Sequence, residues 1–234
     1  MAPSLRLIAA EVVRRADLRP GERVLDIGTG TGVGASAALG EDRSVVGVDA
    51  APGMLAIARR QVPEAEFVEA DFGALPFPDA SFDAVIAVHA LHFADDPVAV
   101  LAEWRRVDIP GGRLSISVPG PRRALYLPIF HAIYRRYGLE RRIGIPTLTA
   151  LAERARRAGW RRVKTAADPT TVIRLADAAA FGRWMRTGSR SAAARSLSEE
   201  DFEALVADLL VATPRAPDGT LAIPFGSLYL TAQR

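Results

Sequence analysis

The chain has 234 residues, of which 49% are hydrophobic, and this length supports one sizeable α/β domain with a large buried core. It contains no cysteine, which excludes disulfide bonds and cysteine-ligated metal sites, and no other metal-binding pattern is visible. No segment approaches the roughly 18 consecutive apolar residues that span a bilayer, and the start of the chain lacks the pattern of a signal peptide. We therefore expect a cytoplasmic protein without a membrane span.

The formal net charge is +3, but it is unevenly divided along the chain. Residues 1–120 hold 11 basic and 17 acidic side chains, whereas residues 121–234 hold 19 basic and 10 acidic ones. Lys164 is the only lysine, so nearly all of the positive charge is arginine. A solvated arginine-rich surface is the simplest interpretation of this excess, and a site for an anionic substrate or for nucleic acid is the alternative.

The first half of the chain alternates between strand and helix patterns. An amphipathic helix is expected over residues 3–17. Apolar strands are then expected at 23–27, 44–48, 66–70, 82–88 and 113–118, and helices at 35–39, 52–61 and 97–107. This alternation predicts a parallel sheet with helices on both faces. Between the last of these helices and the last strand, Pro110-Gly111-Gly112 is interpreted as a turn.

After Pro121 the pattern changes to arginine-rich helices. Helices are expected over 122–143, 147–158, 175–187 and 198–210, with a strand-like segment at 160–166. The segment from Leu221 to Ala232 is rich in residues that favour strands, although Pro224 and Gly226 interrupt it. The second half thus adds helices and the last strands to the core that the first half builds.

The strongest local signal is the segment VLDIGTGTG, which covers residues 24–32. An apolar strand runs here into three alternating glycines that open a helix, and a backbone without Cβ atoms can lie close against a ligand. A dinucleotide fingerprint is also satisfied from Gly30, but in a late register. Asp26 ends the strand, where a carboxylate can accept from an amino group or orient the loop. The α-ammonium of S-adenosylmethionine suits such an acid better than a pyrophosphate does.

Acidic residues lie at three successive strand ends, namely Asp26, Asp49 and Asp71. The ends of adjacent parallel strands share one edge of the sheet, which is where such folds bind ligands. Asp49 can accept from both ribose hydroxyls, and Asp71 from an adenine amino group, while Phe72 or Met54 covers the ring. The structural alternatives are a helix N-cap for Asp49 and an ordinary loop acid for Asp71.

The order and spacing of these motifs resemble those of class I S-adenosylmethionine-dependent methyltransferases, and more closely the small-molecule group called methyltransferase type 11. The resemblance covers residues 20–120 and rests on VLDIGTGTG, VGVDA, EADFGALPFPDASFDAV, ALHFADDP and IPGGRLSISV. The group often has Arg-Pro-Gly-Gly at the expected turn, where this chain has Asp108-Ile109-Pro110-Gly111-Gly112. The resemblance implies one domain over residues 1–234, with a Rossmann-like seven-stranded sheet in which Leu228 to Ala232 form an antiparallel strand.

The resemblance also implies S-adenosylmethionine as the cofactor. The residues expected to contact it are Asp26, Gly28, Thr29, Gly30 and Gly32 at the methionine and ribose end, Asp49, Ala50 and Met54 at ribose and adenine, Asp71 and Phe72 at adenine, and His89 near the methionine moiety.

Methyl transfer needs mainly an aligned acceptor and the exclusion of water, because the sulfonium is already activated. A general base is required only where the acceptor holds a proton of high pKa. His89 and His92 are the candidates. For His89 the alternatives are a substrate contact or a structural role, and for His92 the alternative is packing and hydrogen bonding.

A helical lid over the acceptor is expected from residues 1–17, 122–143 and 175–213. The side chains predicted to line the acceptor site are Tyr126, His131, Tyr134, Phe181 and Trp184. Core packing or a solvated helix face is the alternative for these residues.

The sequence therefore predicts an enzyme that methylates a small apolar or aromatic metabolite, such as a natural product or a quinone. The alternative is a protein of the same fold that binds the cofactor and acts as a cyclase or a binding module. A nucleic-acid acceptor is disfavoured because VHALHF, after the fourth strand, lacks the proline- and aromatic-containing motif that base-modifying enzymes tend to carry. The sequence does not reveal the acceptor atom or the oligomeric state.

Overall fold

The computed structural model describes residues 3–40, 42–120, 126–139, 147–168, 172–187, 197–224 and 226–234. The chain divides into two compact units. The sheet unit comprises Met1–Pro121, Ile145–Asp168 and Ser227–Arg234, and the inserted unit comprises Arg122–Gly144 and Pro169–Gly226. In the described residues, no helix is long and apolar enough to cross a membrane.

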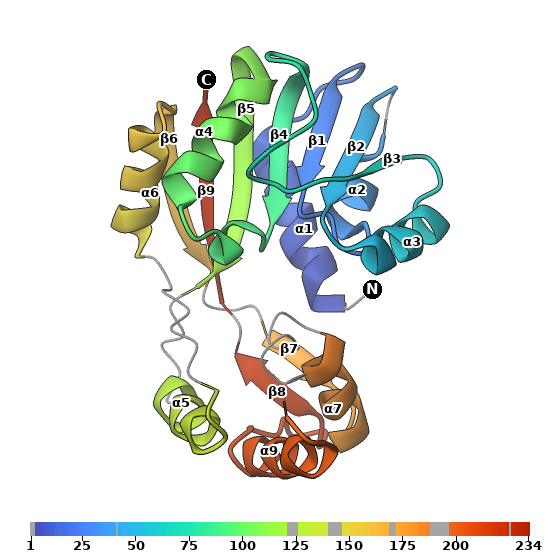
Figure 1. The fold of residues 1–234 in the computed structure, drawn as a ribbon, viewed down its shortest axis with the longest axis vertical. Coiled ribbons are helices and arrows are strands. Elements are labelled where there is room, and N and C mark those ends of the chain that lie inside the picture. Colours follow the sequence, from blue (N-terminus) through green and yellow to red (C-terminus); the bar gives the residue numbers. More distant parts are fainter. Residues whose placement is uncertain are drawn as a thin grey trace. The chain divides into compact units, whose positions relative to one another are not determined.

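The sheet unit is built on a seven-stranded sheet in the order β3-β2-β1-β4-β5-β9-β6 (Figure 1). The strands are β1 (Arg23–Ile27), β2 (Ser44–Asp49), β3 (Glu66–Glu69), β4 (Phe82–Val88), β5 (Asp108–Pro119), β6 (Arg161–Asp168) and β9 (Ser227–Gln233). β9 is antiparallel to β5 and β6, and the pairs from β3 to β5 are parallel. The predicted sheet is confirmed, including the antiparallel strand that contains Leu228 to Ala232.

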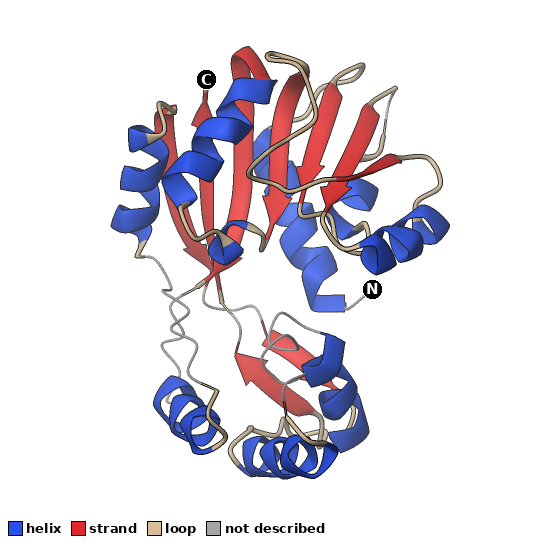
Figure 2. Ribbon diagram, in the orientation of Figure 1, coloured by secondary structure: helices blue, strands red, loops and turns tan. Residues whose placement is uncertain are grey.

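Helices cover both faces of this sheet, as predicted (Figure 2). The helices of the sheet unit are α1 (Pro3–Ala16), α2 (Val33–Ala38), α3 (Pro52–Gln61), the 3-10 turn η1 (Leu91–Phe93), α4 (Pro97–Val107) and α6 (Leu148–Arg157). α1 and α2 lie on one face, and α4 and α6 on the other. Proline occupies the first turn of α3 and α4, and the Asp96 side chain caps α4 by accepting from the N–H groups of Val98 and Ala99.

The predicted turn at Pro110-Gly111-Gly112 is wrong, because these residues lie within β5. Pairing with β4 begins already at Asp108, opposite Phe82, and the register shifts before Arg113 pairs with Ala84. Such an irregularity lets a Pro-Gly-Gly segment remain in a strand. As a consequence Asp108 is fully buried, and neither carboxylate oxygen has a hydrogen-bond partner among the described residues.

The inserted unit contains α5 (Tyr126–Arg136), α7 (Ala178–Thr187), α9 (Glu199–Val211) and an antiparallel pair of strands, β7 (Val172–Leu175) and β8 (Leu221–Pro224). Ser198 caps α9 by accepting from the Asp201 N–H. Three acids in the first turn also stabilise this end of the helix, because their negative charges interact favourably with the helix dipole. The predicted helix at 175–187 is preceded by β7, and the segment from Leu221 to Ala232 is divided between β8 and β9 of different units.

Candidate cofactor and active site

The glycine loop after β1 adopts backbone conformations that other residues rarely enter. Gly28, Gly30 and Gly32 have φ angles of 67°, 55° and 86°. A Cβ atom at Gly28 would lie 2.5 Å from the Ala90 Cβ, so this residue lets the segment after β4 pack against the loop. A Cβ atom at Gly30 would meet no other atom within 4 Å. The loop at Gly30 therefore faces open space in which a ligand can approach the backbone.

Asp26 lies beneath this loop and is almost fully buried. Its Oδ2 accepts hydrogen bonds from Thr29 Oγ1 at 2.6 Å and from the Ala35 N–H at 2.7 Å. Its Oδ1 is buried and has no hydrogen-bond partner among the described residues. Burial raises the pKa of Asp26 to about 6, against the opposing effect of the two hydrogen bonds. These contacts agree with the role of orienting the loop, and a contact between Asp26 and the cofactor remains a prediction.

Gly34, which the sequence analysis did not single out, makes room for this carboxylate. A Cβ atom at Gly34 would lie 2.6 Å from Asp26 Oδ2. The Thr29 hydroxyl is likewise turned inward, and a Cβ atom at Gly47 would lie 2.9 Å from it. The side chain of Thr29 thus supports the loop from inside.

Asp49 ties the end of β2 to the glycine loop. Its Oδ2 accepts from the Gly30 N–H and its Oδ1 from the Ala51 N–H, both at 2.9 Å. Ala51, and not Asp49, is the N-cap residue of α3, so the N-cap alternative for Asp49 is wrong. Each carboxylate oxygen can accept a second hydrogen bond, which leaves capacity for ribose hydroxyls.

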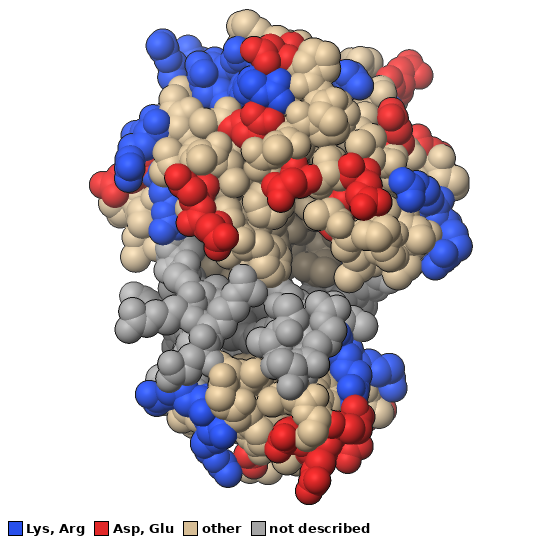
Figure 3. Space-filling model, viewed as in Figure 1, with Lys and Arg blue, Asp and Glu red and all other residues tan. Residues whose placement is uncertain are grey.

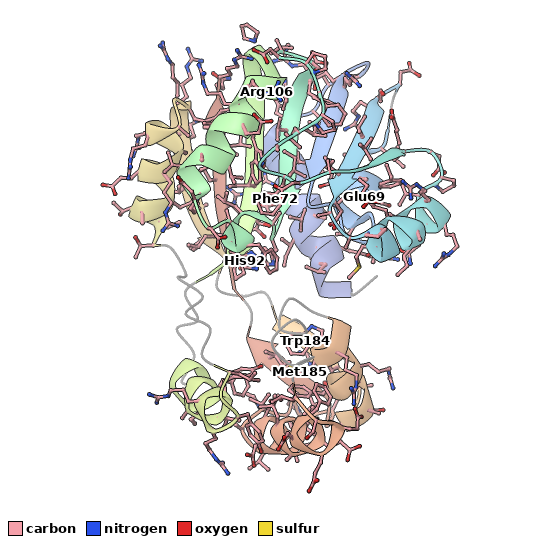
Figure 4. All side chains as sticks on the ribbon, viewed as in Figure 1. Glu69, Phe72, His92, Arg106, Trp184 and Met185 are labelled. Carbon is pink, nitrogen blue, oxygen red and sulfur yellow. The ribbon has the colours of Figure 1, made fainter. Side chains whose placement is uncertain are left out.

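Asp71 and Phe72 follow β3 at the same edge of the sheet. Asp71 is exposed, and its Oδ1 accepts from the Gly73 N–H at 2.6 Å. The Phe72 carbonyl accepts from Trp104 Nε1 at 2.9 Å, and the two rings meet edge to face with centroids 6.4 Å apart. Phe72 lies beside α4 in Figure 4. Of the other two residues predicted to contact the cofactor here, Met54 lies half-buried in the first turn of α3, and Ala50 is exposed.

The two candidate bases lie beyond β4, where Figure 4 labels His92. His89 has a φ angle of 54°, and its N–H donates to the Ser117 carbonyl at 3.0 Å and to Ser117 Oγ at 3.2 Å. His89 Nε2 lies 3.2 Å from Ser227 Oγ. His92 lies in η1, and its ring centroid is 6.3 Å from that of His89. The His92 ring also lies tilted against the Phe93 ring, with centroids 4.0 Å apart. A catalytic role for either histidine remains a prediction.

Sequence reasoning missed three buried residues, Ser117 in β5 and Ser227 and Tyr229 in β9, of which Ser117 pairs with Tyr229. Burial raises the pKa of the Tyr229 hydroxyl above its ordinary value, against the opposing effect of the Ser227 hydroxyl. The Arg15 guanidinium lies 4.8 Å from the Tyr229 ring centroid. The alternation of polar and apolar residues in β9 is the sequence signal that could have indicated these residues. It was not sufficient, because it does not show which strands lie beside β9.

Three of the predicted acceptor-site side chains come together in the inserted unit. Phe181 is buried in its core, with its ring centroid 5.7 Å from that of Trp184. The Tyr134 hydroxyl lies 3.7 Å from Met185 Sδ, the side chain that is labelled beside Trp184 in Figure 4. The side chains of Tyr126 and His131 lie outside the described residues. An acceptor-lining role for the five side chains remains a prediction. Across the described part of the chain, no group of three potential ligands could hold a metal ion.

Residues 25–116 match a family model described as a methyltransferase domain. Over 176 residues the chain is 32% identical to the demethylmenaquinone methyltransferase of Streptomyces avermitilis, which covers 68% of this chain and 76% of that protein. The chain belongs to the class I S-adenosylmethionine-dependent methyltransferase family. The resemblance inferred from the five motifs is thereby confirmed.

Other family members match a shorter part of the chain. The demethylmenaquinone methyltransferase of Renibacterium salmoninarum is 41% identical over 112 residues, which are 46% of this chain and 47% of that protein. For the enzyme of the same name from Beutenbergia cavernae, the identity is 43% over 123 residues, or 48% of this chain and 51% of that protein. The chain thus spans about half the length of these two relatives.

Solved structures match nearly the whole chain at low sequence identity. Phosphoethanolamine N-methyltransferase 2 of Haemonchus contortus, in complex with S-adenosyl-L-methionine, has a TM-score of 0.63 at 20% identity and covers 97% of this chain and 52% of that chain. The cyclase SpnF has a TM-score of 0.67 at 22% identity, and the match covers 98% of this chain and 80% of that chain. Both likenesses show the class I methyltransferase fold. Since one of the two proteins is a cyclase and the other a methyltransferase, the fold alone does not determine which reaction is catalysed.

Proposed function

We propose that this chain is an enzyme that transfers a methyl group from S-adenosylmethionine to a quinone-like aromatic small molecule in the cytoplasm. The observation that carries the proposal is the hydrogen bond that links the glycine loop to a strand-end carboxylate, in which the Gly30 N–H donates to Asp49. The names of the relatives from Streptomyces avermitilis and Renibacterium salmoninarum support a quinone-like acceptor.

Two features of the sheet unit fit the cofactor. The open space beside Gly30 admits a ligand against the backbone, and Asp26 Oδ1 is a buried acceptor without a hydrogen-bond partner among the described residues. The residues that would hold the cofactor are those of the glycine loop, with Asp49 toward the ribose and Asp71 and Phe72 toward the adenine. Phe72 suits this task because the Trp104 hydrogen bond fixes its carbonyl, and with it the backbone after β3.

When bound, S-adenosylmethionine supplies a methyl group on a positively charged sulfur, which leaves as the neutral thioether of S-adenosylhomocysteine. The chain's own task is to hold the acceptor in line with that methyl group and to exclude water. His89 and His92, beyond β4, are the side chains proposed to take the proton that an acceptor hydroxyl loses.

Lid segments 1–17, 122–143 and 175–213 are proposed to cover the acceptor, with Tyr126, His131, Tyr134, Phe181 and Trp184 on its walls. In α1, Ile8 and Val12 are buried while Leu7 is 72% exposed, so the helix still offers an apolar side chain. On the face of the sheet unit that Figure 3 shows, basic and acidic side chains are interspersed, so this face gives no support to a nucleic-acid acceptor.

The test is to incubate the purified chain with S-adenosylmethionine and a short-chain 1,4-naphthoquinol that lacks the ring methyl group. We expect S-adenosylhomocysteine to accumulate together with an acceptor heavier by one CH2 group, both measured by mass spectrometry. Calorimetry should show binding of S-adenosylhomocysteine and none of NAD. Cofactor binding without turnover of any quinol would instead favour the alternative, a cyclase or binding protein of the same fold.

A further inference from the structure

His89 is held by serines from two strands at the edge where the cofactor is proposed to bind. Its backbone N–H donates to both the carbonyl and the hydroxyl oxygen of Ser117 in β5, and its φ angle of 54° lies in the left-handed region. A residue other than glycine adopts this conformation at an energetic cost, and such costs gather at functional sites. The Ser117 contacts fix where the His89 side chain begins.

Ser227 then fixes the ring. This serine is the first residue of β9, is 1% exposed, and places its hydroxyl 3.2 Å from His89 Nε2. It lies opposite Pro119 of β5 and Asp168 of β6, so its position is set by pairing on both sides. The backbone of Ser227 is thus held in place by the strands on both sides.

A hydroxyl at this distance can pair with either form of the neutral imidazole ring, because it can both donate and accept. If Ser227 donates to Nε2, the ring proton stays on Nδ1, and if Ser227 accepts, the proton stays on Nε2. Proton removal requires the second form, in which Nε2–H donates to Ser227 Oγ and the lone pair of Nδ1 can take the acceptor's proton. The same logic governs histidines that are oriented by a second hydrogen-bonding partner in other active sites.

We propose that Ser227 is a positioning residue that orients the His89 ring for proton removal from the acceptor; this inference rests on the proposed function. In that step the nucleophilic atom of the acceptor bonds to the methyl carbon, and the carbon–sulfur bond breaks with its electron pair remaining on sulfur. The acceptor's proton moves to His89 and then to solvent. Ser227 neither contacts the acceptor nor carries the proton.

Ser115 provides a matched control. It is buried in β5, and its hydroxyl donates to the Val12 carbonyl of α1 at 2.7 Å. Ser115→Ala therefore removes a buried serine hydrogen bond without removing a contact to His89. Ser227→Thr keeps a hydroxyl at the tested position and shows whether the hydroxyl itself is what matters.

The first measurement is the ring nitrogen resonances of His89 by 15N NMR in the complex with S-adenosylhomocysteine, which needs no turnover. The chain has three histidines, so the variant His89→Gln assigns the signals. We expect one dominant tautomer in the wild type and in Ser115→Ala, and a mixture in Ser227→Ala. Unchanged His89 resonances in Ser227→Ala would overturn the proposal.

The second measurement is turnover of the naphthoquinol across pH. Ser227→Ala should lower kcat about two- to tenfold with an unchanged KM for the cofactor, and should displace the acidic limb of the pH profile. Ser227→Thr should restore most of kcat, and Ser115→Ala should resemble the wild type. Equal losses of kcat in Ser227→Ala and Ser115→Ala would show that Ser227 contributes only to packing and would overturn the proposal. If no quinol is turned over, the proposed acceptor fails, and the NMR result still decides the Ser227–His89 pair.

Discussion

The Asp49 carboxylate, at the end of β2, accepts a 2.9 Å hydrogen bond from the backbone N–H of Gly30 in the loop after β1. Two strand ends are thereby joined through one side chain, and the second oxygen of that side chain holds the N–H of Ala51, just before α3. A change at Asp49 therefore alters both the charge and the shape of the proposed ribose site.

Asp49→Ala should weaken cofactor binding. The loss of a charge-assisted contact to a ribose hydroxyl should cost about 1.5–3 kcal/mol of binding free energy, as measured by calorimetry with S-adenosylhomocysteine. Glu66→Ala, an exposed acid at the start of β3, serves as the control and should bind normally. An Asp49→Ala variant with wild-type affinity would refute the ribose assignment.

Gly34→Ala should damage the site from inside. The added methyl group would overlap the Asp26 carboxylate, which is held in place by Thr29 and Ala35. Overpacking of this kind costs about 1–3 kcal/mol of folding stability, and we expect a fall in cofactor affinity as well. Gly53→Ala in α3 is the control, because its Cβ meets nothing within 4 Å; it should be neutral or stabilising by up to about 1 kcal/mol in urea unfolding. If the two variants unfold alike, the space argument is wrong.

Asp108→Asn should change how stability depends on pH. Burial raises the pKa of Asp108 from 3.8 to about 8, against the nearby guanidinium groups of Arg234 and Arg113. The folded state then holds this proton more tightly than the unfolded state. Protonated Asp108 therefore contributes its full stabilisation of the folded state below about pH 4, and this contribution is lost as the pH rises to 8.

In that interval the free energy of unfolding of the wild type should fall by up to about 1.4 kcal/mol per pH unit on account of Asp108. Asparagine keeps the shape and cannot ionise, so the variant should be the more stable protein at pH 8, and its advantage should shrink toward pH 5. Asp26, with its pKa raised to about 6 by burial, titrates in both proteins and cancels in the difference. Parallel pH curves from urea unfolding would show that Asp108 does not titrate in this range.

Trp104→Phe and Trp160→Phe form a matched pair. Each removes a buried indole N–H that donates to a carbonyl, Phe72 for Trp104 at 2.9 Å and Leu101 for Trp160 at 2.8 Å. Each should lower the free energy of unfolding by about 1–3 kcal/mol, because the carbonyl loses its donor. Only Trp104→Phe should also weaken S-adenosylhomocysteine binding, because only it releases Phe72. Equal affinities of the two variants would argue against Phe72 as part of the adenine site.

Local patterns were sufficient for the parallel half of the sheet and for the glycine loop. The apolar runs of β1, β2 and β4 are buried as the sequence predicts, and the three acids expected to serve the cofactor lie at or just after the ends of β1, β2 and β3. Each of these features is decided by residues within a few positions of one another, because a strand, its turn and the next helix are neighbours in sequence. The positions of Asp26, Asp49 and Asp71 follow from this rule.

Features that depend on distant pairing were not predictable. Ser227 is separated from His89 by 138 positions, and their contact requires β9 to lie beside β5 in one particular register. Asp108 was assigned to the edge of a turn because proline and glycine follow it, whereas its pairing with Phe82 extends β5 and buries it. The division at Gly226 between β8 and β9 likewise depends on which unit each strand joins.

The place of β9 between β5 and β6 also bears on the order in which the protein is made. The ribosome completes β9 after the other six strands of the sheet, so the nascent chain presents β5 and β6 with open edges until β9 arrives. An open edge exposes backbone groups that can pair with another chain. Late closure over long sequence separations is also slow. Newly made chains therefore pass through a stage in which they can aggregate, and Ser227 reaches His89 only when that stage ends.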